Sequence, residues 1–252
     1  MKALITGASE GIGLEIAKKL AAKNYEITLI ARSQDKLEKA LSTLPGKGHQ
    51  IIVADLSKRD NVDALKEKIE TNHYDVFINN AGVGMYGRFT EMPLSEQVKM
   101  MNLNMTALTV LSYFYLNAAK KGNTLINIAS TLGTTSYAGA SVYAATKAYV
   151  TSLSESLWWE NKNKGIYVMG FCPGATYTNF HKVSGGDKDD FPKFTMQTAE
   201  QAVKELVRAF EKRKRPKVIS GGLNRFMVSI QKLMSRSMVV SMMAGFGPLK
   251  GQ

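Results

Sequence analysis

Two kinds of hydrophobic pattern alternate along this chain. Short, mainly apolar runs predict buried strands at 3–6, 26–31, 49–53, 76–78, 124–129, 166–172 and 217–220. Longer stretches with apolar residues three or four positions apart predict helices between them, the longest at 95–120, with Ser95 as its N-cap, and 142–161. Because strands and helices alternate throughout, we expect an α/β fold: a single-domain, doubly wound parallel sheet of seven strands with helices on both faces.

Length and composition agree with one large core in a reducing compartment. A chain of 252 residues lies within the range of single α/β domains. Cys172 is the sole cysteine and cannot form an internal disulfide. The chain begins without a basic and apolar leader and has no uninterrupted apolar run of about 18 residues, so we expect a cytoplasmic protein. The three histidines are scattered, so no metal site is expected.

The positive charge is concentrated near the C-terminus. Net charge is +12, and residues 211–252 contain nine Lys or Arg and one acidic residue. We therefore divide the chain into a dinucleotide-binding catalytic part, 1–222, and a basic amphipathic extension, 223–252. A helix over 224–243 would place Arg225, Ser229, Lys232 and Arg236 on one stripe.

Several partners suit a basic amphipathic helix at 224–243. It could make peripheral contact with anionic membranes, cover a subunit interface, close a substrate pocket or simply be solvated. Nucleic acid is not expected as a partner, because the charges are interleaved with methionines and not with aromatic residues on which bases could stack.

The first predicted strand leads directly into a glycine-rich turn. The sequence Gly7-Ala8-Ser9-Glu10-Gly11-Ile12-Gly13 precedes an apolar-periodic helix that ends near residue 23. Glycines allow a tight turn and close backbone approach, while the free N–H groups and dipole of a helix N-terminus attract an anion. The turn therefore predicts a phosphate-binding site, and the alternative is an ordinary helix start after a tight turn.

Two further strand ends carry candidate nucleotide contacts. Arg32 follows the second strand, where a carboxylate would bind the ribose hydroxyls of NAD and a basic residue accommodates the extra phosphate of NADP. We therefore predict NADP, although a plain surface arginine would look the same. Asp55 and Leu56 follow the third strand; Asp55 either touches an adenine edge or caps the helix over 58–71.

Tyr143, Lys147 and Ser130 are the candidate groups for proton transfer. Tyr143 and Lys147 lie one turn apart on a predicted helix, and Ser130 follows the fifth strand. A cation within about 4–6 Å favours a phenolate and lowers the tyrosine pKa, so Tyr143 could act as general acid or base. A solvated lysine on an amphipathic helix is the alternative, and only agreement with the other motifs favours the catalytic interpretation.

Together these motifs resemble those of the short-chain dehydrogenases/reductases. The matching residues keep the family's order and spacing over residues 2–220: Thr6-Gly7-x-x-x-Gly11-x-Gly13, Asp55, Asn79-Asn80-Ala81-Gly82, Asn104, Ser130, Tyr143-x-x-x-Lys147 and Pro173-Gly174. The resemblance implies a Rossmann-like sheet and an oxidoreductase that transfers a hydride between nicotinamide and a carbonyl or alcohol substrate. With Arg32, we expect NADPH to be preferred over NADH. A non-catalytic dinucleotide sensor or scaffold is the alternative.

The resemblance also implies roles for individual residues. Tyr143 would exchange a proton with the substrate oxygen, Ser130 would orient that oxygen, and Lys147 would lower the tyrosine pKa and bind the nicotinamide ribose. Asn104 would hold a water that relays protons from Lys147, with Asn102 as its competitor. The cofactor-binding set is Gly7, Ser9, Gly11, Ile12, Gly13, Arg32, Asp55, Leu56, Asn80, Ala81, Gly82, Tyr143, Lys147, Pro173, Gly174, Thr176 and Thr178. Glu10 departs from the pattern, because NADP-dependent members often carry a basic or small residue there.

The substrate walls are expected at 83–89, 132–138 and 180–196. Met85, Tyr86 and Tyr137 indicate an apolar pocket, and Gly185-Gly186-Asp187 followed by Phe191 and Phe194 is typical of a mobile flap or a variable loop. Family members commonly pair through the helices expected at 95–120 and 142–161, so we expect a homodimer or homotetramer.

Overall fold

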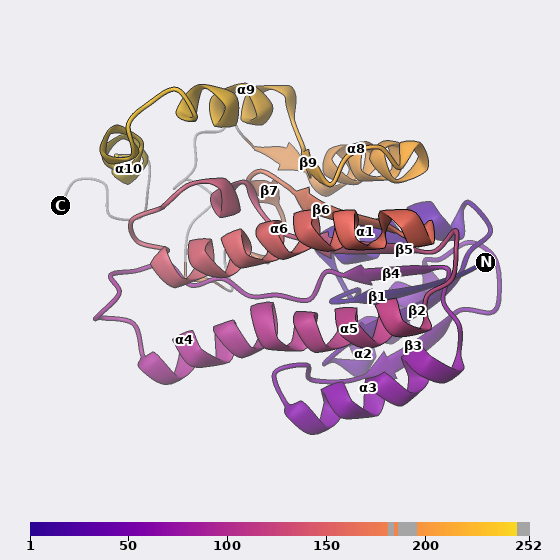
Figure 1. The fold of residues 1–252 in the computed structure, drawn as a ribbon. Coiled ribbons are helices and arrows are strands. Elements are labelled where there is room, and N and C mark those ends of the chain that lie inside the picture. Colours follow the sequence, from indigo (N-terminus) through magenta and orange to yellow (C-terminus); the bar gives the residue numbers. More distant parts are fainter. Residues whose placement is uncertain (181–183, 186–195, 246–252) are drawn as a thin grey trace.

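Seven parallel strands form the central sheet. The computed structural model describes residues 1–180, 184–185 and 196–245, and within them the strand order is β3-β2-β1-β4-β5-β6-β9 (Figure 1). The strands are β1 Lys2–Thr6, β2 Glu26–Ala31, β3 Gln50–Val53, β4 Val76–Asn79, β5 Thr124–Ile128, β6 Tyr167–Cys172 and β9 Lys217–Ile219. The predicted α/β class and seven-stranded parallel sheet are confirmed. A small sheet of β7 Thr176–Tyr177 and β8 Gln197–Thr198 was not predicted.

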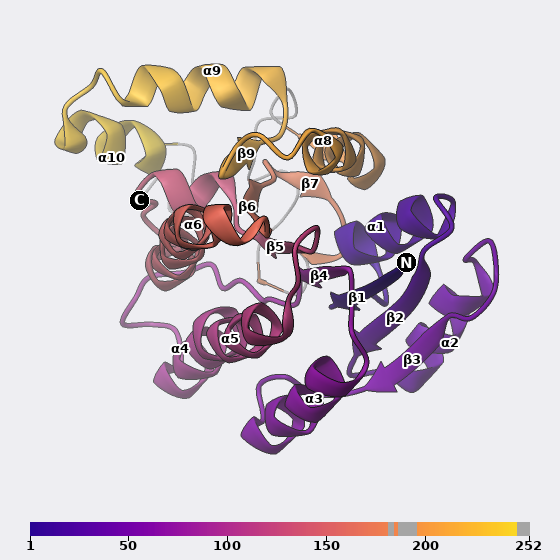
Figure 2. The same ribbon diagram turned by 45° about the vertical axis from the view of Figure 1, so that its right-hand side comes forward.

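Helices cover both faces of the sheet (Figure 2). One layer consists of α1 Gly11–Ala21, α2 Gln34–Ser42 and α8 Ala199–Lys212, and the other of α3 Arg59–Thr71, α5 Leu108–Ala118 and α6 Ser141–Asn161. The remaining α-helices described are α4 Leu94–Met101, α9 Gly222–Gln231 and α10 Arg236–Ala244. Because both faces are covered, the strands are nearly continuous apolar runs.

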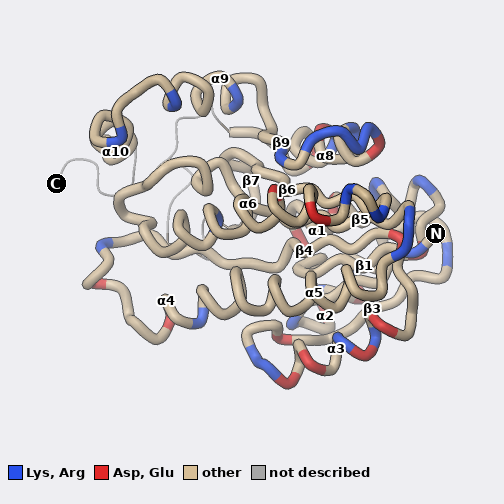
Figure 3. Tube along the Cα trace, viewed as in Figure 1, with Lys and Arg blue, Asp and Glu red and all other residues tan. Residues whose placement is uncertain are grey.

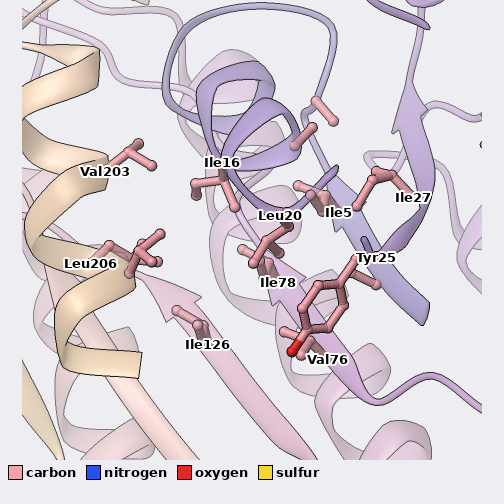
Figure 4. Close-up of a cluster of buried hydrophobic side chains, with 14 of the residues drawn as sticks. Ile5, Ile16, Leu20, Tyr25, Ile27, Val76, Ile78, Ile126, Val203 and Leu206 are labelled. Carbon is pink, nitrogen blue, oxygen red and sulfur yellow. The ribbon is translucent and has the colours of Figure 1, made fainter. Parts of the chain in front are cut away.

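The larger core cluster lies between the sheet and the α1–α8 layer. Figure 4 shows Ile16 and Leu20 of α1 and Val203 and Leu206 of α8 directed toward the strands, where Ile5 lies in β1. All five side chains are buried. Their packing fixes the start of α1 against the end of β1, which is where the glycine turn lies.

A buried polar network connects the sheet to the opposite helix layer. Asn79 Nδ2 in β4 donates to Ser112 Oγ in α5 and to Asn127 Oδ1 in β5, both at 3.0 Å. Asn127 Nδ2 in turn donates to Ser154 Oγ in α6 at 3.1 Å. Buried amides need such partners, so the network fixes α6 relative to the strands. Sequence reasoning did not find it.

The long helix predicted over 95–120 is interrupted. It consists of α4, a π-helical segment Asn102–Ala107 and α5. The predicted cap at Ser95 is wrong, because α4 begins at Leu94 with Pro93 as its N-cap and no side-chain capping bond. The fixed φ of proline suits the entry to a helix, so the turn before α4 starts it without a serine cap.

The single helix predicted over 224–243 is also wrong. It breaks after Gln231, and α10 starts at Arg236 with Ser235 as its N-cap, Ser235 Oγ accepting from Met238 N at 3.3 Å. A serine hydroxyl that bonds to the backbone competes with helix continuation and favours a new helix start. Arg225 and Lys232 therefore belong to α9, and Arg236 to α10.

Candidate functional site

One large cavity lies at the carboxyl ends of the strands. Its volume is about 690 Å³, and the strand order reverses at its centre, between β1 and β4, where open α/β sheets bind ligands. The predicted site residues that line it are Gly7, Ser9, Gly11, Ile12, Arg32, Asp55, Leu56, Asn80, Ala81, Gly82, Ser130, Tyr143, Lys147, Pro173, Gly174, Thr176 and Thr178. Gly13 and Asn104 are not among the lining residues.

The glycine turn has the geometry of an anion cradle. Gly7 and Gly11 have φ of +62° and +60°, and a Cβ at Gly7 would lie 2.8 Å from Ala81 Cα. A Cβ at Gly13 would lie 2.4 Å from the Gly7 carbonyl oxygen, so Gly13 supports the turn from behind. No side chain caps α1, which leaves its first N–H groups available to a phosphate. These residues therefore fit a dinucleotide pyrophosphate.

Asn80 holds the turn in place. Its side-chain amide donates to the carbonyl oxygens of Thr6 at 3.0 Å and Gly7 at 2.9 Å. The hydroxyl of Thr6 accepts from the backbone N–H groups of Asn80 and Ala81 at 3.0 and 2.9 Å. These hydrogen bonds connect the end of β1 to the end of β4, at the place where the strand order reverses. Asn80 lines the cavity, as expected, and its amide is occupied in supporting the glycine loop.

The cavity contains a second basic residue near Arg32. Arg32, Ser33 and Lys36 all line the cavity. Lys36 Nζ lies 3.3 Å from Glu10 Oε2, and Asn179 Nδ2 donates to the same oxygen at 3.1 Å. The unusual acid at position 10 is therefore partly neutralised by α2. Sequence reasoning missed Lys36 because its place one turn into α2, opposite Glu10, depends on how α1 and α2 pack.

Asp55 stabilises the turn between β3 and α3. Its Oδ1 accepts from the Ser57 N–H at 3.1 Å and from the Ser57 hydroxyl at 2.8 Å. Burial acts to raise the pKa of Asp55, but these hydrogen bonds and the nearby Arg32 outweigh it and hold the pKa below its ordinary value. The N-cap of α3 is Lys58 and not Asp55. The carboxylate therefore stays ionised at the cavity wall.

Tyr143, Ser130 and Lys147 converge in the cavity. The hydroxyl of Tyr143 is hydrogen-bonded to the Ser130 side chain, and Ser130 Oγ also accepts from Leu132 N at 3.1 Å. Lys147 lies one turn along α6, with Nζ 5.9 Å from the Tyr143 ring centre and donating to the Ile128 carbonyl at 2.9 Å. Tyr143 and Lys147 are both buried. The predicted phenol, ammonium and seryl hydroxyl thus meet at one wall.

The pKa shifts differ from the sequence expectation in one respect. Burial raises the pKa of Tyr143 above its ordinary value, an effect that the hydrogen bond from Ser130 only partly offsets. Burial also lowers the pKa of Lys147 to about 8, because its Nζ has no carboxylate partner among the described residues. Desolvation dominates both groups, so the net shift of the Tyr143 pKa is upward, and the lowering of that pKa by Lys147 stays a prediction.

Asn104 connects the substrate wall to α6. Its Oδ1 accepts from Val83 N at 3.0 Å, and its Nδ2 donates to Val83 O at 2.9 Å and to Thr146 Oγ1 at 3.1 Å. The competitor Asn102 is exposed, whereas Asn104 is buried. A Cβ on Gly82 would lie 3.1 Å from Asn104 Oδ1 and 3.3 Å from Lys147 Nζ, so both polar groups flank the same backbone. The water relay itself stays a prediction.

An apolar cluster surrounds Tyr143. Tyr86 and Phe180 pack against the Tyr143 ring at centre distances of 6.4 and 5.6 Å, and Leu132 and Tyr137 belong to the same cluster. These residues come from the three predicted walls. Most of the third wall, including Phe191 and Phe194, lies outside the described residues.

The C-terminal helices form a wall that sequence reasoning did not assign by residue. The additional lining residues are Asn224, Met227, Val228, Ile230, Gln231, Met234, Met242 and Met243. Met243 also packs against the cluster that contains Tyr143. Of the interpretations of 224–243, closure of the pocket thus agrees with the structure. Residues 224, 227, 228 and 231 fall on one face of a helix, and this spacing is the sequence pattern that could have identified the wall.

Comparison with known proteins identifies the family. A family model described as short chain dehydrogenase matches residues 1–189. The chain belongs to the short-chain dehydrogenase/reductase family. It is 31% identical over 206 residues to the very-long-chain 3-oxoacyl-CoA reductase of Anas platyrhynchos, covering 78% of this chain and 65% of that protein. The Mus musculus protein of the same name is 28% identical, covering 97% of this chain and 78% of that protein.

Solved structures agree with this assignment. A short-chain dehydrogenase from Sphingobium yanoikuyae in complex with NADPH is 28% identical and superposes with a TM-score of 0.80, covering 92% of this chain and 94% of that one. This short-chain dehydrogenase/reductase is therefore an oxidoreductase that acts on carbonyl or alcohol substrates, and dependence on NAD(P) is typical of its family. Among the described residues, no helix is both long and apolar enough to cross a membrane.

Proposed function

We propose that this short-chain dehydrogenase/reductase is an NADP-dependent carbonyl reductase or alcohol dehydrogenase with Tyr143 as its general acid/base. The observation that carries this proposal is the hydrogen bond between the Tyr143 hydroxyl and Ser130, with Lys147 buried beside them in the cavity. NADP supplies the hydride or accepts it when bound. The solved relative from Sphingobium yanoikuyae, in complex with NADPH, supports the same cofactor type.

Four side chains have separate roles in proton transfer to or from the substrate oxygen. Ser130 donates a hydrogen bond that orients the substrate oxygen, and the Tyr143 hydroxyl gives that oxygen a proton during reduction or takes one during oxidation. Lys147 at one turn's distance stabilises the phenolate that remains, and burial strengthens this interaction by excluding water. Asn104 keeps the Val83 backbone in register with α6, so the wall beside the reacting oxygen stays fixed.

Turnover of a carbonyl panel tests the proposal. We expect loss of NADPH absorbance with at least some apolar aldehydes, ketones or 3-oxoacyl compounds, because the wall around Tyr143 is apolar. Binding of NADPH without turnover of any carbonyl or alcohol would instead support the non-catalytic sensor.

Lys36 is expected to contribute to NADP preference together with Arg32. Lys36→Ala should raise the Kd for NADPH about three- to tenfold and leave that for NADH nearly unchanged, because only NADPH brings a phosphate to this end of the groove. Glu10→Gln should lower the Kd for NADPH, since it removes a carboxylate that competes for Lys36. Fluorescence titration measures both constants.

The control for this prediction is Lys39→Ala, which removes an exposed charge from the same helix but outside the cavity lining. Equal loss of NADPH affinity in the Lys36 and Lys39 variants would contradict the prediction, because Lys36 would then act only through the overall positive charge of α2 and not through a contact with the phosphate. A wild-type chain that binds NADH as tightly as NADPH would contradict the cofactor assignment itself.

We also propose how the chain is divided, where the protein works and how it assembles. Residues 1–222 form the catalytic unit, and 223–252 form an extension whose described helices complete the pocket. The protein works in the cytoplasm as a homodimer or homotetramer, paired through α4–α5 and α6, and touches membranes peripherally through 224–243. Tyr113 on α5 and Trp159 on α6, both exposed, support the pairing. Sedimentation equilibrium measures the assembled mass.

A further inference from the structure

The helical hairpin of α9 and α10, residues 222–244, presents two apolar surfaces. Its inner surface, with Met227, Val228 and Met243, lines the cavity. Its outer surface contains Leu223, Phe226 and Leu233, spaced three and seven residues apart along α9 and its end, together with Met238 on α10; Ile230, between Phe226 and Leu233, is 41% exposed and also borders the cavity. Phe226 is 62% exposed, Leu233 89% and Met238 57%. A helix that serves only the core has a polar outer face, so this second stripe indicates a partner.

The charges beside the outer stripe have one sign. Residues 222–245 contain Arg225, Lys232 and Arg236 and no acidic residue, and in Figure 3 every charged position on α9 and α10 is basic. Arg225 forms an ion pair with Glu205 of α8. Lys232 and Arg236 are exposed and form no ion pair with any residue in the described part of the chain. Two cations thus lie beside the apolar stripe, and no acidic side chain within residues 1–180, 184–185 and 196–245 balances them.

We propose that the outer face of this hairpin docks on an anionic lipid bilayer. Phe226, Leu233 and Met238 enter the interfacial region, while Lys232 and Arg236 reach lipid phosphates at the same depth. A second copy of the chain suits this face less well. In an isologous contact the same face of both copies meets, so Lys232 and Arg236 of one copy would lie near those of the other, and this face carries no acidic residue to offset their repulsion. A bilayer supplies both the apolar layer and the negative charge.

This docking also bears on the substrate, and here the inference rests on the proposed function. The hairpin's inner surface borders the cluster that contains Tyr143. A docked hairpin therefore places the substrate end of the cavity toward the lipid. The class of substrate that suits this arrangement is an apolar carbonyl or alcohol compound that partitions into membranes.

Vesicle sedimentation of the full-length protein tests the docking without any substrate. We expect the wild type to pellet with phosphatidylcholine vesicles that contain phosphatidylglycerol and to pellet less with phosphatidylcholine alone. The double variant Phe226→Ser/Leu233→Ser should lower the partition coefficient about tenfold or more, because two large apolar side chains no longer enter the interface. Lys232→Glu/Arg236→Glu should abolish the preference for anionic vesicles.

Matched controls separate docking from folding and from catalysis. Leu94→Ser removes an apolar side chain that is 70% exposed on α4, and Lys39→Glu reverses an exposed charge on α2; both should bind vesicles like the wild type. All variants should reduce a short, water-soluble ketone at the wild-type rate, since none of these residues lines the cavity. Wild-type protein that stays in the supernatant with anionic vesicles would overturn the docking, as would unchanged binding of both hairpin variants. A fall in oligomer mass in the Phe226/Leu233 variant would assign the face to a second copy and overturn it too.

Discussion

Tyr143→Phe is expected to lower kcat by about 10²–10⁴-fold while NADPH binding stays close to that of the wild type. The substitution removes the hydroxyl that is hydrogen-bonded to Ser130, which is the group we assign to proton transfer. The ring, by contrast, remains packed against Tyr86 and Phe180. The cavity should therefore keep its shape. Single-turnover reduction of the best substrate of the panel gives the rate, and fluorescence titration gives the Kd for NADPH.

Tyr149→Phe is the matched control for this experiment. It removes a tyrosine hydroxyl from the same helix, where Tyr149 lies outside the cavity and its oxygen is 2.7 Å from Thr109 Oγ1. We expect near-wild-type turnover in this variant. If Tyr143→Phe also kept near-wild-type turnover, the proton donor would have to be a different group and the assignment would be wrong.

Gly133→Ala is expected to impair both stability and catalysis, although Gly133 is not a chemical group of the site. Gly133 lies in the 3₁₀ turn Thr131–Thr134 that follows Ser130, and a Cβ there would lie 2.5 Å from the Lys147 carbonyl oxygen and 2.6 Å from its carbonyl carbon. The contact is with helix backbone, so no side chain can rotate away. The turn must separate from α6, which moves Ser130 away from Tyr143.

The size of this effect follows from overpacking and from misplacement. Overpacking of a tight contact costs about 1–3 kcal/mol of unfolding free energy, and a displacement of about 1 Å at a catalytic group costs on the order of 10²-fold in rate. Urea denaturation and kcat measure the two effects. Gly222→Ala is the control, because a Cβ at Gly222 has its nearest neighbour, the Arg225 side chain, at 3.8 Å. Wild-type kcat in Gly133→Ala would contradict the prediction, because it would mean that displacing the turn after Ser130 does not slow catalysis.

The strand, glycine turn and helix start at the N-terminus could be predicted because their determinants are local. An apolar run followed by Gly7, Gly11 and Gly13 specifies a strand, a tight turn and a helix start by backbone conformation alone, and two of these glycines have positive φ. Tyr143 and Lys147 share a face because they are four residues apart on one helix. The parallel sheet follows from the alternation of strands and helices, since parallel strands need crossover connections.

Other features depended on contacts between elements distant in sequence. Lys36 faces Glu10 only because α1 and α2 pack on the same side of the sheet. The interruption at Asn102–Ala107 places Asn104 against Val83 and Thr146, and periodicity does not show such a change of helix type. The direction of the Tyr143 pKa shift also depended on burial, which no motif records.

The sequence by itself determined the α/β class, the family and the residues from which the site is built, because these depend on short-range spacing and on the order of the strands. Only the tertiary structure decided that 222–244 forms two helices, that their inner surface completes the cavity, and that their outer stripe stays exposed beside Lys232 and Arg236, which pair with no acid among the residues that the structure describes. The physical reason is that both surfaces of the hairpin are apolar in sequence. Packing against the rest of the fold selects which one is buried.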